Sequence, residues 1–536
     1  MRSTMRQEML EGIIDILQTL QDAAKQLQAA YTSENLQMFE MLGGELLNGI
    51  ESVGEIARQC KEDAACERLG KACICAADSL KDIMQLVRRN PGEVAWKLEC
   101  ELLMILENMA LEFYYWELVN EHPERMEEFR RQMMKTGYFY RLEQPVEERV
   151  YACDLSIQVI GYNHLDVTKK CTQSLLANLP KDVSYELVLF NHGSDDGTRE
   201  FFESIEGAHV INLTINRAFV TQTNRAMRGK YSLYISNDVF VGGNAIDNMY
   251  RAIAAHDDYG WIVPTTPNVS NCQTIPANYH DEEGFLAFVQ RNNIYDERRH
   301  EVRTRLCNPV TMIRTDDYSQ FQMDFYEQIY CVPNISSFPD DKMSLWMRRH
   351  GYKSILAKDA YCHHVGSVTL KNDFKTQKEQ KEFYDAGRWK FWKDFGVDPW
   401  GTGAVYSPEL FAAWHLSQTE RVAVLGINCG LGSNSLKVKE ILREHGSQDV
   451  ILYNATQEDC YLQDLKGVSD EAFVFDELGD IGEKTGRNRF DYIVIDDQLR
   501  DCAFGEYLDK LDKAGIGYGE IAFRDEEGNW HIVRGN

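Results

Sequence analysis

The sequence predicts an α/β protein in which a helical segment precedes two successive α/β domains. A proline-poor segment with apolar residues at three- and four-residue spacing opens the chain, and short β-rich runs alternating with amphipathic stretches begin near residue 150. A second cycle of the same kind starts after residue 416. We therefore expect an α-helical bundle over residues 1–142, an α/β domain over 150–400 and a small doubly wound α/β domain over 416–536.

Helix-breaking sequences divide the first segment near Ser33, around residues 61–63, at Pro91 and at Pro123, which predicts four or five helices. The aromatic run at residues 113–116 is interpreted as core, because aromatic clusters on helices are more often buried than exposed. The apolar repeat is carried by Met9, Ile13, Leu17 and Leu20 near the start and by Leu102, Ile105, Met109 and Phe113 further on.

Composition narrows the class of protein. The chain has 57 basic and 84 acidic residues, a net charge of −27 that repels phosphate polyanions, so we expect no nucleic-acid partner. The 14 cysteines show no zinc-ribbon or disulfide-framework spacing, which indicates a reducing compartment. No run approaches the roughly 18 apolar residues of a membrane span, and no signal-peptide pattern opens the chain. We expect a cytoplasmic protein without a transmembrane segment.

Two polar loops follow predicted strands of the middle domain. The strand LSIQVI ends at Gly161, Tyr162 and Asn163, and the strand ELVLF ends at Asn191 with the loop NHGSDDGT. Ligands of parallel sheets bind beyond the carboxyl ends of the strands, so the two loops could share one cleft. The same residue types also favour an ordinary turn and helix N-cap, and this alternative stays open.

Carboxylates and histidines follow further along the same domain. The strand YSLYI leads to Asp238, where a carboxylate could hold a hard divalent cation. Asp340 and Asp341 precede a helix, where they could favour the helix dipole or supply a general base. His363 and His364 follow a short strand and could ligate a metal or serve the structure alone.

The order of these motifs from about Leu155 to Thr369 resembles the inverting family-2 glycosyltransferases of the GT-A fold, the nucleotide-diphospho-sugar transferases. LSIQVIGYN looks like their first strand, and ELVLFNHGSDDGT looks like the second strand with its loop. KYSLYISNDVFV is similar to the segment of the metal-binding aspartate, FPDDKMSLWMRRHGYK to that of the acidic pair, and HHVGSVT to the closing histidine segment. The resemblance implies a GT-A domain between the bundle and the last domain.

The resemblance implies single-displacement transfer with inversion at the anomeric carbon. Asp341 would be the general base, and Asp340 a supporting or acceptor-binding carboxylate. Asp238, with His364 or His363, would hold a divalent metal, Mn²⁺ or Mg²⁺, that stabilises the departing diphosphate. The residues that would bind the nucleotide-sugar donor are Gly161, Tyr162, Asn163, Asn191, Asn216, Asn224 and Asn237.

The sequence departs from the family pattern at three positions. Asn191 stands where an aspartate usually accepts the ring N–H of uracil or thymine, although an asparagine still offers a carbonyl oxygen. Ser236 replaces the first aspartate of the usual D-x-D motif, which leaves Asp238 as the main carboxylate ligand. Ala218 stands where a glycine is common. We prefer an active enzyme, because carboxylates remain at the metal and base positions.

In the last domain, VAVLGINCGLGSN resembles motif I of class I methyltransferases. Gly426, Asn428 and Asn454 stand where those enzymes carry residues that favour S-adenosylmethionine, so we expect this cofactor to be unlikely. The interpretation is a Rossmann-like module without methyl transfer. Gly430 and Gly432 could also form an ordinary tight turn between strand and helix.

These observations favour an inverting hexosyl- or deoxyhexosyltransferase that uses a UDP- or dTDP-sugar. The acceptor would be a hydroxyl group of a glycan, such as a bacterial cell-surface glycan, or of a protein. The alternatives are a bifunctional glycosyltransferase and methyltransferase, or a non-catalytic binding scaffold. We expect the acidic N-terminal bundle to contact a protein partner or a second copy of the chain rather than a membrane.

Overall fold

The structure is a computed structural model that describes residues 2–59, 64–119, 122–134, 141–213, 226–326, 336, 338–366, 376–417, 420–498, 504–525 and 527–535. Contacts within the chain define two compact units. The first comprises Met1–Thr172, Asp182–Asn237 and Arg314–Tyr326, and the second comprises Gln173–Lys181, Asp238–Ile313 and Glu327–Asn536. Within these described ranges, every helix is too short or too polar to span a bilayer.

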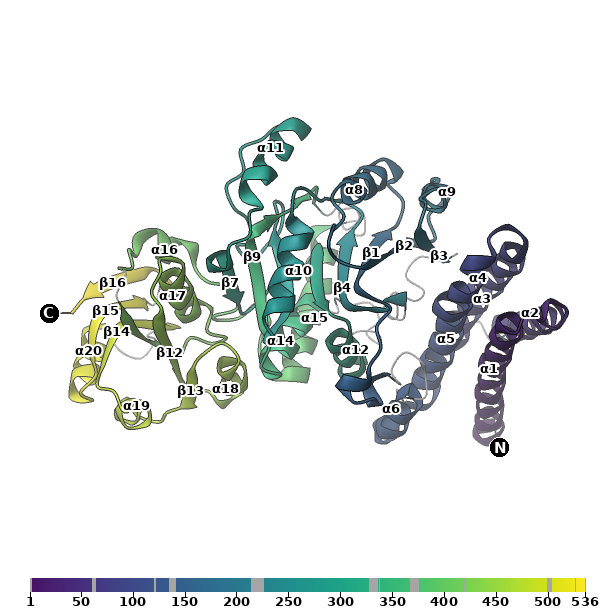
Figure 1. Cartoon of the computed structure of the whole chain (residues 1–536). Helices are drawn as coiled ribbons and strands as arrows, with labels where there is room; N and C mark the ends of the chain where they lie inside the picture. The colour runs from purple at the N-terminus through teal and green to yellow at the C-terminus, as the bar shows by residue number, and fades with distance from the viewer. Residues whose placement is uncertain are drawn as a thin grey trace. The chain divides into compact units, whose positions relative to one another are not determined.

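Helices make up the first part of the first unit (Figure 1). The Asn35 side chain caps the second of them by accepting the Met38 N–H (3.1 Å), and Pro91 occupies the first turn of the fourth. Two π-helical turns, η1 (Leu98–Leu103) and η2 (Tyr115–Val119), flank the fifth helix. The α-helices are α1 Arg2–Thr32, α2 Leu36–Gln59, α3 Ala64–Arg89, α4 Pro91–Lys97, α5 Met104–Tyr114 and α6 Met126–Met134.

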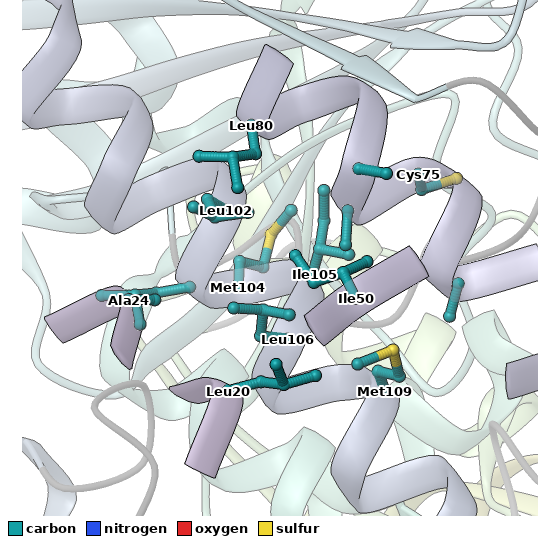
Figure 2. Packing of buried hydrophobic residues seen from close by; sticks show 14 of the residues in the cluster. Leu20, Ala24, Ile50, Cys75, Leu80, Leu102, Met104, Ile105, Leu106 and Met109 are labelled. Atoms are coloured by element: carbon teal, nitrogen blue, oxygen red, sulfur yellow. The ribbon is translucent and has the colours of Figure 1, made fainter. Parts of the chain in front are cut away.

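The long helices share one apolar core, part of which is drawn in Figure 2. Ile50 of α2, Leu80 of α3 and Ile105 of α5 are fully buried there, because the three- and four-residue spacing places them on the inner face of each helix. Phe113 and Tyr115 are each 2% exposed. The aromatic run therefore lies mainly in the core, as its helical setting predicts.

The first unit continues into parallel strands in the order β3-β2-β1-β4. Most of their residues are buried, as is typical of strands covered on both faces. The carboxyl ends of β1, β2 and β4 share one edge, where Gly161, Asn191 and Ser236 lie. The elements are β1 Cys153–Gly161, β2 Tyr185–His192, β3 Ala208–Leu213 and β4 Gly229–Ser236, with helices α8 Leu165–Ala177, α9 Thr198–Glu203 and α12 Thr315–Asp324.

The second unit carries strands in the order β8-β6-β9-β7, in which only β6 and β9 pair in parallel. A short antiparallel pair of β5 and β10 lies apart from them. The strands are β5 Val239–Phe240, β6 Tyr259–Thr265, β7 His300–Arg303, β8 Val310–Arg314, β9 Lys353–Tyr361 and β10 His363–His364. The helices are α10 Ala245–Ala255, α11 Glu282–Asn292, α14 Pro339–Arg349 and α15 Gln377–Phe395.

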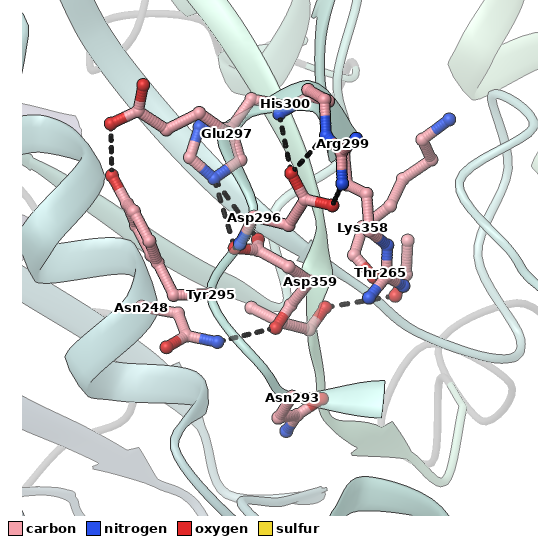
Figure 3. A network of polar contacts seen from close by, with 12 residues as sticks. Asn248, Thr265, Asn293, Tyr295, Asp296, Glu297, Arg299, His300, Lys358 and Asp359 are labelled. Carbon is pink, nitrogen blue, oxygen red and sulfur yellow. Dashed lines mark hydrogen bonds and ion pairs between the residues drawn. The ribbon is translucent and has the colours of Figure 1, made fainter. Parts of the chain in front are cut away.

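A polar network centred on Asp359 fixes the segment before β7, as Figure 3 shows. The fully buried Asp359 carboxylate accepts the Asp296 N–H (2.9 Å) and faces His300 Nε2 (3.2 Å). Asn248 Nδ2 donates to the Asp359 carbonyl oxygen (2.7 Å). Buried polar groups that are paired in this way hold a loop in one conformation, so the start of β7 has a defined position against β9.

The C-terminal part of the second unit is a six-stranded sheet in the order β13-β12-β11-β14-β15-β16, parallel except for the last strand. Helix α17 packs against β11, β12 and β14. The strands are β11 Arg421–Ile427, β12 Asp449–Thr456, β13 Glu471–Val474, β14 Arg489–Gln498, β15 Gly517–Arg524 and β16 Trp530–Arg534. The helices are α16 Pro408–Ala413, α17 Ser433–Glu444, α18 Asp459–Lys466, α19 Gly479–Thr485 and α20 Phe504–Lys513.

Candidate active site

Asparagine side chains tie together the loops that follow β1, β2 and β4 in the first unit. Asn163 Oδ1 accepts the Asp195 N–H (3.0 Å), and the Asn163 N–H donates to Ser194 Oγ (2.9 Å). Asn237 Nδ2 donates to Thr168 Oγ1 (2.8 Å) at the start of α8. The structure thus brings Asn163 and Asn237 to one set of loops, as the motif order predicts.

Asn191 lies in the same loops but is only 2% exposed. Its Oδ1 accepts the Ser194 N–H (3.0 Å), and its Nδ2 donates to Asn212 Oδ1 (3.1 Å). The carbonyl oxygen that we expected to meet a pyrimidine is therefore used inside the protein. Burial also lowers the pKa of the neighbouring His192 to about 4, which keeps that imidazole neutral at pH 7.

Of the other predicted donor-binding residues, Gly161 and Tyr162 lie in the described part of the chain. Gly161 ends β1 so close to Phe202 that an added Cβ would lie 3.0 Å from its ring, and Tyr162 is half-buried. Asn216 and Asn224 fall outside the described residues. Asp196 Oδ1 accepts the Thr198 N–H (3.2 Å) at the start of α9, so the alternative interpretation of this loop as a helix cap also describes part of it.

Asp238 and His364 face each other in the second unit. Pairing of β5 with β10 sets His364 opposite Val239, and His364 Nε2 lies 3.4 Å from Asp238 Oδ2. Both residues are at least nine-tenths buried. His363 points elsewhere: its Nδ1 lies 2.5 Å from Tyr279 Oη, and its ring stacks on Phe240. The structure thus separates the two histidines that the sequence had grouped together.

The donors at this pair suit a hard divalent cation. Asp238 Oδ2 and His364 Nε2 face each other, and the other ring nitrogen, His364 Nδ1, has no hydrogen-bond partner among the described residues. In those residues no group of three or more His, Cys, Asp or Glu side chains gathers as a metal site. Of the described residues, Asp238 and His364 could supply two ligands to Mn²⁺ or Mg²⁺, and phosphate oxygens and water could add others.

The acidic pair lies at the start of α14, where Pro339 fits the first turn and Phe338 has a left-handed φ of 50°. Asp341 is 7% exposed and forms an ion pair with Arg305, whose Nε donates to Oδ1 and whose Nη2 lies 3.4 Å from Oδ2. Asp340 is half-buried. The Asn308 amide, oriented with its NH₂ group toward Asp340, donates to Oδ1 (2.5 Å).

The two carboxylates differ in their electrostatic surroundings. Burial and the neighbouring charge of Asp341 raise the pKa of Asp340 to about 6. Burial also raises the pKa of Asp341, although the Arg305 guanidinium opposes it. Asp340 thus titrates near neutral pH without a bound guanidinium, while Asp341 is neutralised by a cation.

Arg305 and Asn271 belong to the site, although no sequence motif pointed to them. Asn271 Oδ1 accepts from Arg305 Nη1, and Asn271 belongs to a loop in which Asn268, Asn271 and Cys272 all have positive φ. The same loop reaches His364, whose carbonyl oxygen accepts from Asn268 Nδ2 (3.0 Å). A cluster of asparagines with Gly-like conformation between β6 and α11 could have been a signal for this loop.

Helix α14 is held from its far end by the C-terminal part of the chain. The fully buried Asp464 of α18 binds Arg348 through Oδ1 (2.7 Å) and Arg349 through Oδ2 (2.8 Å). Arg348 Nη1 also donates to the Thr304 carbonyl oxygen, next to Arg305. One carboxylate thus links α18 to the helix of the acidic pair.

The glycine-rich turn before α17 is filled by the chain itself. The Leu431 and Ser433 N–H groups donate to the carbonyl oxygens of Thr402 and Gly403 (both 3.0 Å). A Cβ on Gly430 would collide with the Thr402 carbonyl oxygen. Backbone groups that bind a cofactor in related turns are therefore already paired here.

Residues 156–329, less than half of the chain, match the family model of glycosyl transferase family 2. No curated protein sequence matches the chain. This match supports a glycosyltransferase domain in that segment and leaves the C-terminal part without an assigned family.

Solved glycosyltransferases show a distant structural similarity, at 14% identity in each case. They are GalNAc-T7 with UDP, GalNAc and Mn²⁺ (TM-score 0.30, covering 40% of this chain and 44% of that one), a mannosyltransferase of Pyrobaculum calidifontis with GDP-Man and Mn²⁺ (0.27, 47% and 68%) and S. aureus TarS 1–349 (0.28, 39% and 60%). The chain spans less than half of the first of these proteins. Scores this low add no argument to the family match.

Proposed function

We propose that the protein is an inverting glycosyltransferase that moves a sugar from a nucleoside-diphosphate donor to a hydroxyl group. The observation that carries the proposal is the match of residues 156–329 to glycosyl transferase family 2. The contacts at Asp238, His364 and the acidic pair support it, because they offer a cation site and a titratable carboxylate within one unit.

Asp238 and His364 would hold the divalent cation, which neutralises the leaving diphosphate when bound. His363 is not proposed as a ligand, because its Nδ1 faces Tyr279. In the first unit, Tyr162, Asn163 and Asn237 stay proposed donor-binding residues, together with Gly161, Asn216 and Asn224. Asn191 is proposed to shape the loop rather than to bind the base, since both ends of its amide are used.

We propose Asp340 as the general base, in place of Asp341. The Asp341 oxygens face Arg305, whereas Asp340 is half-buried and its pKa is raised to about 6. A general base works best when its pKa lies near the operating pH. Asp340 would take the proton of the acceptor hydroxyl, and Asp341 with Arg305 would orient the start of α14.

Transfer or hydrolysis of radiolabelled UDP-, dTDP- and GDP-sugars in the presence of Mn²⁺ or Mg²⁺ tests the proposed activity. We expect release of nucleoside diphosphate from at least one donor and its loss on removal of the metal with EDTA. An Asp238→Ala and Asp340→Asn double variant is the matched control. Absence of turnover and of nucleotide binding for every donor would reject the enzyme.

A non-catalytic scaffold is the second candidate function. The observation that favours it is the internal pairing of Asn163 and Asn191, which leaves fewer polar groups of these loops for a donor. Methyl transfer is less supported, because Thr402 and Gly403 occupy the N–H groups of the glycine-rich turn. A cytoplasmic location and a partner or second copy on the N-terminal helices stay predictions.

A further inference from the structure

An exposed tryptophan lies next to Arg305, the arginine that pairs with Asp341. Trp400 is 39% exposed, although a tryptophan is normally among the more deeply buried residues. It lies in the segment between α15 and α16, outside the residues that match the glycosyltransferase family. Ligand sites typically combine exposed aromatic side chains with a few polar or charged groups.

The ring of Trp400 packs against two other aromatic rings. Its centroid lies 4.9 Å from that of Phe338 and 5.8 Å from that of Tyr384. Its backbone N–H donates to Asp398 Oδ1 (3.0 Å), and Asp398 pairs with Arg388 of α15. The ring is therefore fixed before any ligand arrives, which lowers the entropic cost of binding.

Polar groups line the neighbourhood of this ring. The Arg305 guanidinium lies over the Trp400 ring, with its Cζ 5.6 Å from the ring centroid, and it also binds Asp341 and Asn271. Asn271 is 7% exposed, and its Nδ2 donor has no partner among the described residues. Phe338, whose ring packs against Trp400, precedes Asp340 by two residues at the start of α14. An aromatic ring, the Arg305 guanidinium and the Asp341 carboxylate are thus close to one another.

We propose that Trp400 is the platform of an acceptor subsite that binds a saccharide; this rests on the proposed function. A pyranose offers an apolar C–H face that packs on an aromatic ring, and hydroxyl groups that hydrogen-bond to guanidinium and carboxylate groups. One hydroxyl group gives its proton to Asp340. The oxygen of that acceptor hydroxyl group forms a bond to the anomeric carbon of the donor sugar. At the same time the bond from the anomeric carbon to the diphosphate breaks, and the nucleoside diphosphate leaves.

The subsite therefore favours a glycan acceptor over a serine or threonine of a protein. A small hydroxyl side chain would cover little of the tryptophan face, whereas a sugar ring covers it with a rigid C–H surface. A protein acceptor is the outcome that would count against the subsite.

The test uses the full chain, the donor sugar that shows turnover, and p-nitrophenyl glycosides of glucose, galactose, N-acetylglucosamine and rhamnose as acceptor probes. Trp400→Ala is expected to raise the acceptor KM about tenfold or more, and Trp400→Phe to raise it less, because it keeps an aromatic face. The matched control is Trp389→Ala, which removes a tryptophan of α15 that is 60% exposed. It should change the acceptor KM less than twofold.

The outcomes separate this subsite from the proposed activity. Wild-type protein that neither hydrolyses nor transfers any donor sugar would overturn the activity and the subsite with it. Wild-type protein that hydrolyses the donor but shows equal acceptor KM values in Trp400→Ala and wild type would overturn the subsite alone. Transfer to a serine-containing peptide but to no glycoside would also overturn it. The melting temperature of Trp400→Phe, measured by circular dichroism, tests whether the fold is intact.

Discussion

The second unit contains two helix starts whose sequences resemble ligand-binding motifs of known families, and the two differ in which groups lie there. Before α17, the N–H groups of Leu431 and Ser433 are paired with carbonyl oxygens of Thr402 and Gly403. At the start of α14, Asp340 stays half-buried with a pKa of about 6. The first helix start is closed by the chain, and the second keeps a titratable group within reach of solvent.

A glycine-rich turn can therefore serve packing alone. Gly403 and Gly430 lie so close to opposing backbone atoms that a Cβ at either would collide with them. The glycines therefore allow the segment at 402–403 to pack closely against the turn, at the place where related turns bind a cofactor. Chemistry in this unit is expected at α14, and the following experiments test that contrast.

The largest expected effect is at Asp340. Asp340→Asn removes the proposed proton acceptor and should lower transfer by about 10²–10⁴-fold, the usual contribution of a general base. Nucleoside-diphosphate release under saturating donor measures it, with Asp341→Asn compared in parallel. Wild-type turnover in Asp340→Asn together with an inactive Asp341→Asn would return the base to Asp341.

Removal of the carboxylate that joins α18 to α14 should destabilise the second unit strongly. Asp464→Ala leaves Arg348 and Arg349 without their shared buried partner, which typically costs about 3–5 kcal/mol. Urea unfolding followed by circular dichroism gives the free energy. Asp449→Ala breaks an exposed pair with Arg421 and should cost at most about 1 kcal/mol. Equal losses of unfolding free energy in the two variants would show that the buried Asp464 pairs stabilise the protein no more than an exposed pair does.

The cation site predicts a graded series of losses. Asp238→Ala should abolish the metal-dependent part of nucleotide binding, and His364→Ala should weaken it by about tenfold, because one ligand remains. His363→Ala should have the smallest effect, since that side chain faces Tyr279. Calorimetric titration of UDP with and without Mn²⁺ measures each step. The order would be refuted by a larger loss in His363→Ala than in His364→Ala.

The raised pKa of Asp340 predicts the pH profile. A general base must be deprotonated to accept a proton. We therefore expect kcat/KM to be constant above about pH 7 and to fall about tenfold for each pH unit below about pH 6. The acid limb should be missing from the residual activity of Asp340→Asn. A limb that persists unchanged in this variant would assign the titration to another group.

The smallest expected effect is at the closed turn before α17. S-adenosylmethionine should leave the melting temperature of the full chain unchanged, because a ligand that does not bind the folded state adds no stability. Thermal unfolding monitored by dye fluorescence measures this, with UDP and Mn²⁺ as the ligand expected to raise the melting temperature. A rise with S-adenosylmethionine would show that the segment at 402–403 can be displaced.

Local pattern was sufficient for much of the fold. Apolar spacing predicts the helices of the first 134 residues, and short β-rich runs predict β1, β2, β4 and β11, because each depends on short-range periodicity. The position of Asp238 after a strand and of Asp340 and Asp341 at a helix start also follows from neighbours in the sequence. The choice between Asp340 and Asp341 did not follow, since both occupy the same turn.

Tertiary structure decided which of these groups meet. Arg305 pairs with Asp341 across 36 residues, and Arg348 with Asp464 across 116, so neither pair leaves a local pattern in the sequence. His363 and His364 are neighbours with identical side chains, yet strand pairing directs one to Tyr279 and the other to Asp238. The sequence by itself determined which chemical groups lie at the ends of elements, because that depends on periodicity. Packing determined their partners and their pKa values, because burial and charge depend on elements that are distant in the chain.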